Sequence, residues 1–144
     1  MLEVFRKLHD EKEVRRFYVG GALGVDMWAA EQILRLKEQP GYEDIELVVA
    51  LPFVGHDAKW DQRSKRRMEF ILQHCSKKEV IGNEDCRESY VKRNCYMVDQ
   101  ANYLVAVYDD GRNLRSGTMQ CVRYAQKNHV PVVLVHPDTA IITW

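Results

Sequence analysis

The sequence predicts an α/β domain with a doubly wound, mostly parallel sheet of about five strands and helices on both faces. Short apolar runs alternate along the chain with segments in which apolar residues recur every three or four positions. The runs stay apolar on consecutive residues, which is typical of strands buried on both faces of a parallel sheet. The 144 residues, 46% of them hydrophobic, fit one compact domain over residues 1–144. The predicted fold is therefore Rossmann-like.

Each element follows from this periodicity. Strands are predicted at residues 16–19, 45–51, 79–81, 103–108 and 130–135, of which the third has the weakest pattern. Helices are predicted at residues 25–38, 57–75, 89–100 and 117–128, with a further short helix over residues 2–11. Pro40 and Gly41 follow the first long helix and end it, because neither residue continues a helix well.

The composition favours a soluble, cytoplasmic protein that contacts no membrane. Lys plus Arg and Asp plus Glu are each 21, so the chain has no overall basic field that would attract nucleic acid or lipid headgroups. The apolar runs are far shorter than the roughly 18 residues that span a bilayer. The four cysteines form no CxxC pair and the five histidines have no ligand spacing, so we expect reduced thiols and no metal site.

The first predicted site is the loop GGALGVD, residues 20–26, which follows the first strand. Ligands of doubly wound sheets bind beyond the carboxyl ends of the strands, and the helix that begins near Val25 directs its unpaired N–H groups to this loop. Glycine lets an anion approach the main chain, although a tight turn that simply requires glycine is an alternative. Asp26 would cap the helix or accept a ribose hydroxyl. The loop residues predicted to contact a phosphate or a ribose are Gly20, Gly21, Ala22 and Gly24.

The second strand also ends in candidate ligand residues, Pro52 and Phe53. The Phe53 ring would either stack on a base or cover the core, and the sequence leaves both alternatives open. Trp60 lies on an apolar stripe, which favours a place in the core.

The third predicted site combines one helix with the start of the next. Arg93, Asn94 and Asp99 lie on the helix that leads into the fourth strand, and the stretch SGT follows that strand. An arginine can bind a phosphate through two hydrogen bonds, and a helix start that offers hydroxyls and a glycine favours an anion. For any one of these residues alone, a helix cap or a surface charge is the simpler interpretation. The residues predicted at the helix start are Ser116, Gly117 and Thr118.

The motifs GGALGVD, ALPF, RNCYMVD and SGT occur in an order that resembles the YpsA-like branch of the SLOG superfamily, over about residues 17–137. Wider relatives include the LOG phosphoribohydrolases, which activate cytokinins, and DprA. The resemblance implies a Rossmann-like fold that binds a nucleotide or a nucleotide-derived molecule such as an ADP-ribose or NAD-like compound, with no other cofactor. One alternative is a hydrolase that cleaves the N-glycosidic bond of such a molecule. Another is a DprA-like module that binds single-stranded nucleic acid through the basic run at residues 63–67, although such a run is usually a solvated helix face.

Three departures from the family pattern lead to further expectations. The relatives have an additional central strand before the GGA strand, and the present sequence shows a helix there instead, so we expect an incomplete pocket wall. The usual Gly-Gly before the threonine is Ser116-Gly117. Cys121 stands where the hydrolases have a glutamate, which argues against their reaction. Because uncovered strand edges are normally paired, we also expect a homo-oligomer, with an apolar face against a neighbouring copy. The residues predicted on that face are Leu2, Val4, Phe5 and Leu8.

Overall fold

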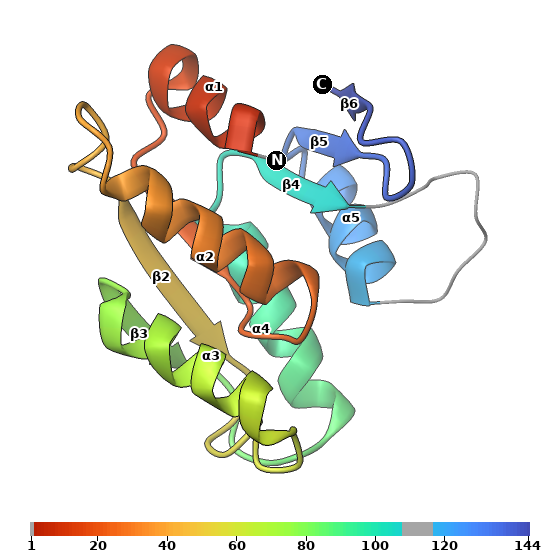
Figure 1. The fold of residues 1–144 in the computed structure, drawn as a ribbon. Coiled ribbons are helices and arrows are strands. Elements are labelled where there is room, and N and C mark those ends of the chain that lie inside the picture. Colours follow the sequence, from red (N-terminus) through yellow and green to blue (C-terminus); the bar gives the residue numbers. More distant parts are fainter. Residues whose placement is uncertain (1, 108–116) are drawn as a thin grey trace.

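The computed structural model describes residues 2–107 and 117–144 and confirms the α/β class (Figure 1). The helices and strands alternate along the chain, and their bounds lie close to the predicted ones. In chain order the elements are α1 Leu2–Lys12, β1 Arg16–Val19, α2 Val25–Lys37, β2 Glu46–Leu51, α3 Gln62–His74, β3 Lys77–Val80, α4 Arg87–Gln100, β4 Leu104–Val107, α5 Gly117–Lys127, β5 Val132–Val135 and β6 Ile142–Thr143.

Helix α3 begins later than the periodicity predicts, at Gln62 instead of residue 57. The side chain of Asp61 accepts a hydrogen bond from the main-chain N–H of Ser64 at 2.7 Å, which caps the helix at this point. The preceding residues form turns, and Trp60 packs against the core from there. The core position predicted for Trp60 is therefore confirmed, although the residue lies outside the helix.

The predicted single sheet is divided into two sheets of three strands. In the first, β1, β2 and β3 are parallel, with Phe17 opposite Leu47. In the second, β4 and β5 are parallel and β5 pairs antiparallel with β6, a short strand that the sequence pattern does not predict. Strands β1 and β4 line the same cavity and are not paired with each other, and each forms one edge of its sheet among the described residues.

Helices cover both faces of the sheets, as predicted. Helix α2 packs against α1 and α3 on one side, whereas α4 and α5 pack together on the other. Figure 1 shows α2 and α3 in front of β2, with α4 behind it. Five of the six residues of β2 are buried, so this strand is the centre of the core. None of the helices described in residues 2–107 and 117–144 has the length and apolar character that crossing a membrane needs.

Helix α1 belongs to the core of its own chain, and the prediction that its apolar face meets a neighbouring copy is wrong. Val4, Phe5 and Leu8 are buried within the chain, and the Phe5 ring meets the Phe17 ring edge-on, with centroids 5.5 Å apart. An amphipathic helix must cover its apolar stripe, and α2 and β1 are close enough to do so. That the protein forms a homo-oligomer stays a prediction, but the apolar face of α1 is not its interface.

The packing of α1 predicts a large loss of stability on truncation of its central aromatic side chain. Phe5→Ala should lower the free energy of unfolding by about 3–5 kcal/mol, because it leaves a cavity in the core. Phe70→Ala is the matched control: this ring is 52% exposed, and its loss should cost less than about 1 kcal/mol. Urea unfolding followed by circular dichroism measures both. Equal losses in the two variants would contradict the assignment of α1 to the core.

Candidate functional site

A cavity of about 1070 Å³ lies between β1 and β4 and is lined by all four residues of each strand. We call it the slot. At the end where both strands terminate, the slot is closed by the loop after β1 and by the first turns of α2 and α5, with the middle of α4 as its floor. This end is the carboxyl-end crevice predicted for a doubly wound sheet. The predicted ligand residues that line it are Gly20, Ala22, Asp26, Arg93, Asn94 and Thr118.

Arg93 is the buried cation of this crevice, with only 6% of its surface exposed. Its Nη1 group donates a hydrogen bond to the carbonyl oxygen of Gly20, and its Nε–H donates to Asn94 Oδ1 at 2.7 Å. The Tyr90 ring lies 5.7 Å from the guanidinium carbon. A guanidinium has five N–H donors, and these contacts use two of them. Among the described residues, Arg93 is thus held by two hydrogen bonds, and its other donors remain for a ligand.

Asp26 lies beside Arg93 in the first turn of α2. Burial raises the pKa of the Asp26 carboxyl, and the attraction of Arg93 and the main-chain N–H groups of Ala22 and Gly20 act in the opposite direction. Burial also disfavours the charged form of Arg93 and so lowers its pKa, and the nearby Asp26 partly offsets this effect. A side chain at position 20 would put its Cβ 2.7 Å from Asp26 Oδ2 and 2.9 Å from Arg93 Nη1. Gly20 is therefore required so that the carboxylate and the guanidinium can approach the main chain.

Helix α5 contributes the opposite wall of the crevice. Asn94 Nδ2 donates to Gln120 Oε1 at 3.0 Å, which ties α4 to α5. One residue further along α5, burial raises the pKa of the Cys121 thiol to about 11, while Arg93 acts to lower it and the Asp26 carboxylate to raise it. Cys121 is consequently a neutral thiol at physiological pH and cannot do the work of a carboxylate.

The glycines of the first loop have different roles. Gly21 has a φ of 68° and is buried, and its carbonyl oxygen accepts a hydrogen bond from His56 Nε2 at 2.9 Å. Gly24 has a φ of 83°, forms the N-cap of α2 and is exposed. No side chain of the described residues caps this helix, so its first N–H groups have no side-chain partner there. Both positive φ values favour glycine over other residues.

Several predicted site residues do not reach the slot. Pro52 and Phe53 are buried, and the Phe53 ring packs edge-on against Tyr90 with centroids 5.7 Å apart, which decides in favour of the core. Asp99 is exposed and accepts a hydrogen bond from the Tyr124 hydroxyl at 2.7 Å. Gly117 is the first residue of α5, and Ser116 lies outside the described residues.

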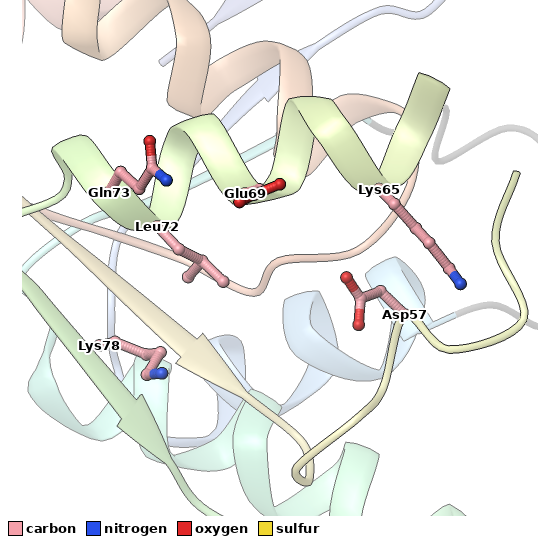
Figure 2. A pocket seen from close by; sticks show the side chains of 6 residues that line it. All are labelled: Asp57, Lys65, Glu69, Leu72, Gln73 and Lys78. Atoms are coloured by element: carbon pink, nitrogen blue, oxygen red, sulfur yellow. The ribbon is translucent and has the colours of Figure 1, made fainter. Parts of the chain in front are cut away.

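A second, smaller cavity of about 480 Å³ lies between α3, β3 and the loop after β2 (Figure 2). Figure 2 shows Lys65 and Glu69 of α3, Lys78 of β3 and Asp57 of the loop around it. Lys65 belongs to the basic run at residues 63–67, in which Arg67 is paired with Glu31. The charges around this cavity are mixed, so it has no basic surface suited to nucleic acid.

Comparison with known proteins places the chain in a family. A family model described as the YspA SLOG family, YpsA, matches residues 1–140. The chain belongs to the YspA SLOG family. This result confirms the resemblance to the YpsA-like branch of the SLOG superfamily, although the match gives no reaction or ligand.

Relatives of this YspA SLOG family member are found in Bacillus and Staphylococcus species. The chain is similar to YoqJ of Bacillus subtilis (strain 168), described as an uncharacterised SPbeta prophage-derived protein, with 34% identity over 152 residues, 96% of the chain and 86% of that protein. A UPF0398 protein of Staphylococcus epidermidis is 28% identical over 94 residues, 64% of the chain and 49% of that protein. A UPF0398 protein of Bacillus cereus is 29% identical over 94 residues, 64% of the chain and 50% of that protein. The chain thus matches about half the length of these UPF0398 relatives.

Sequence reasoning missed three residues that shape the crevice. His56 holds the Gly21 carbonyl, Gln120 links α4 to α5, and Tyr90 lies between Arg93 and Phe53. His56 lies three residues after Phe53, at a strand end that was already predicted as a site. This position is the only feature of the sequence that could have indicated a role for His56. Gln120 and Tyr90 lie on amphipathic helices whose pattern does not distinguish them from other polar or aromatic residues.

The raised pKa of Cys121 predicts slow alkylation in the folded protein. At pH 8 the thiolate fraction should be about 100-fold below that of a thiol with the ordinary pKa of 9.0, because the pKa is about 11. Labelling with iodoacetamide, followed by peptide mass spectrometry, measures the rate at Cys121. The rate should keep rising about tenfold per pH unit up to pH 10 in the folded protein, whereas in urea it should level off near pH 9. The same pH profile in both states would contradict the burial of this thiol.

Proposed function

We propose that this protein binds a nucleotide or a nucleotide-derived molecule, of the ADP-ribose or NAD type, at the carboxyl end of the slot. The observation that carries the proposal is the convergence there of a buried arginine, a glycine loop and two helix N-termini around one cavity. Membership of the YspA SLOG family supports a nucleotide-related ligand. The four cysteines are free thiols, which is consistent with a protein that works in the cytoplasm.

The charges of the crevice suit a phosphate flanked by a ribose. Arg93 and the N-termini of α2 and α5 attract an anion, and a buried guanidinium hydrogen-bonds phosphate strongly. Asp26 repels phosphate but accepts hydrogen bonds from ribose hydroxyls, so it favours a ligand that offers both groups. Thr118, in the first turn of α5, lines the cavity and adds a hydroxyl at the helix N-terminus.

The proposal predicts that removal of the Thr118 hydroxyl weakens binding. A thermal-shift screen with AMP, ADP-ribose and NAD identifies the ligand, since a ligand at 100 times its dissociation constant stabilises the fold by about 2.7 kcal/mol. Thr118→Val keeps the side-chain shape and should raise the dissociation constant at least tenfold, about 1.4 kcal/mol. Thr143→Val, on the exposed end of β6, is the matched control and should bind like the wild type. The proposal fails if no nucleotide stabilises the protein, or if both variants bind equally well.

Hydrolysis of the N-glycosidic bond is a second candidate function, and the observation that favours it is the carboxyl of Asp26. Burial raises the pKa of this half-buried carboxyl, and a carboxyl with a raised pKa is the kind of group that protonates a leaving base. However, the position that the resemblance assigns to the catalytic glutamate is Cys121, whose pKa of about 11 keeps it neutral. One carboxyl without a second ionised group is an incomplete set for this reaction.

We therefore expect no release of ribose 5-phosphate from AMP above the buffer rate. The measurement is a sugar-phosphate assay at increasing protein concentration. The hydrolase would become the leading function if ribose 5-phosphate were released in proportion to the protein concentration. Asp26→Asn would then have to abolish this release, and Asp99→Asn would have to retain it. Asp99→Asn is the matched control because its carboxylate is exposed and outside the slot.

A nucleic-acid-binding module through residues 63–67 is less well supported. The pairing of Arg67 with Glu31 reduces the available positive charge, and the neighbouring cavity carries Asp57 and Glu69 as well as lysines. Single-stranded DNA in the same thermal-shift screen tests this alternative. Nucleic-acid binding would require that the DNA stabilises the wild-type protein and that Arg63→Ala and Arg66→Ala remove this stabilisation.

A further inference from the structure

The loop after β1 is held by side chains on two successive carbonyl groups. Arg93 Nη1 donates to the carbonyl oxygen of Gly20, and His56 Nε2 donates to that of Gly21 at 2.9 Å. The peptide bonds of the described residues are trans, so the N–H of each peptide unit points away from its C=O. The N–H of Ala22, which shares a peptide unit with the Gly21 carbonyl, therefore points away from His56.

This N–H is directed at the carboxyl group of Asp26. The main-chain N–H groups of Ala22 and Gly20 both act to lower the pKa of Asp26, because they donate to its ionised form. The carboxyl lies so close to the loop that a Cβ at position 20 would be 2.7 Å from Asp26 Oδ2. A single peptide unit thus connects His56 to Asp26, with the imidazole on its oxygen and the carboxylate on its nitrogen.

Gly21 makes this peptide unit easy to turn over. The residue has a φ of 68°, and without a Cβ its backbone reaches either orientation at little cost. The reversed orientation would direct the carbonyl oxygen at the Asp26 carboxylate, and the two oxygens would repel each other. His56 is itself held in place, because its ring meets the Trp60 ring edge-on, with centroids 5.1 Å apart, and Trp60 packs against the core. The imidazole is therefore a fixed donor that selects one of the two orientations.

We propose that His56 is a positioning residue of the crevice, which holds the Gly21 carbonyl so that the Ala22 N–H stays on the Asp26 carboxylate. An ionised Asp26 accepts hydrogen bonds from hydroxyl groups, whereas a protonated one donates. His56 thereby favours recognition of a ligand with free hydroxyl groups over protonation of a leaving base. This consequence for the ligand rests on the proposed nucleotide site, whereas the orientation of the loop does not.

The test follows the Asp26 carboxyl and the Ala22 amide by NMR in the full chain without ligand. His56→Leu removes the donor, whereas His56→Gln keeps an N–H donor on a side chain of similar reach. In His56→Leu, Asp26 should titrate at a higher pH than in the wild type, because its ionised form loses a hydrogen bond. The Ala22 amide should also exchange about tenfold faster in this variant. His56→Gln should behave like the wild type in both measurements.

His74→Leu is the matched control and should also leave both measurements unchanged. His74 Nδ1 likewise lies 2.8 Å from a main-chain carbonyl oxygen, that of Phe70, but His74 does not line the slot. The proposal is overturned if Asp26 titrates in His56→Leu as in the wild type. It is also overturned if His56→Gln or His74→Leu shifts the titration as much as His56→Leu does, because the donor to the loop would then not matter.

A measurement on the wild type keeps the proposal testable even if His56→Leu does not fold. The amide proton signal of Ala22 should move downfield as Asp26 loses its proton, because this N–H then donates to a carboxylate. An Ala22 signal that does not follow the Asp26 titration would overturn the proposal. All of these measurements use ligand-free protein, so a failure to bind any nucleotide would refute the proposed function and leave their outcomes unchanged.

Discussion

The hydrogen bonds of Arg93 hold the two halves of the domain together where the sheet is interrupted. In the described residues no main-chain hydrogen bond joins β1 to β4, so helix α4 has to connect the first sheet to the second. Arg93 donates to the Gly20 carbonyl at the end of β1, and the adjacent Asn94 donates to Gln120 of α5, which packs on β4 and β5. A hydrogen bond from a charged group contributes about 1.5–3 kcal/mol, and a buried cation without partners costs more. The relative position of the two sheets at the crevice therefore depends on this pair of residues.

The same contacts create the chemistry of the crevice. Burial raises the pKa of the Asp26 carboxyl and lowers the pKa of the neighbouring Arg93, and the charge of each group opposes the shift of the other. The combination has little net charge, and it keeps guanidinium donors and carboxylate acceptors side by side. A ligand that carries both a phosphate and hydroxyl groups matches it better than a simple anion does. On the proposed function, support of the fold and recognition of the ligand would reside in one cluster. Variants of Arg93 or Asp26 would therefore confound stability with binding, whereas Thr118 variants would change the site more selectively.

Much of the fold and part of the site could be predicted from the sequence. Within the described residues, apolar runs and helical periodicity located the five longest strands and all five helices. The rule that ligands lie beyond the carboxyl ends of strands predicted that Gly20, Arg93 and Thr118 lie close together, and all three line one cavity. The pattern could not show that the sheet is divided, because strand pairing is a long-range property. Nor could it place Phe53, whose burial depends on Tyr90 of a distant helix. An amphipathic helix such as α1 looks the same whether its apolar face meets its own core or a neighbour.

The central claim is that the crevice formed by the loop after β1 and the start of α5 is the nucleotide site. The most direct test is a titration of the 15N-labelled wild-type protein with AMP, ADP-ribose and NAD, followed by two-dimensional NMR. We predict that at least one of these compounds shifts the amide signals of Gly20, Ala22 and Thr118, while those of β3 and the second half of α3 stay in place. Shifts confined to the surface of α3 and β3, or no shift with any of the three, would contradict the account.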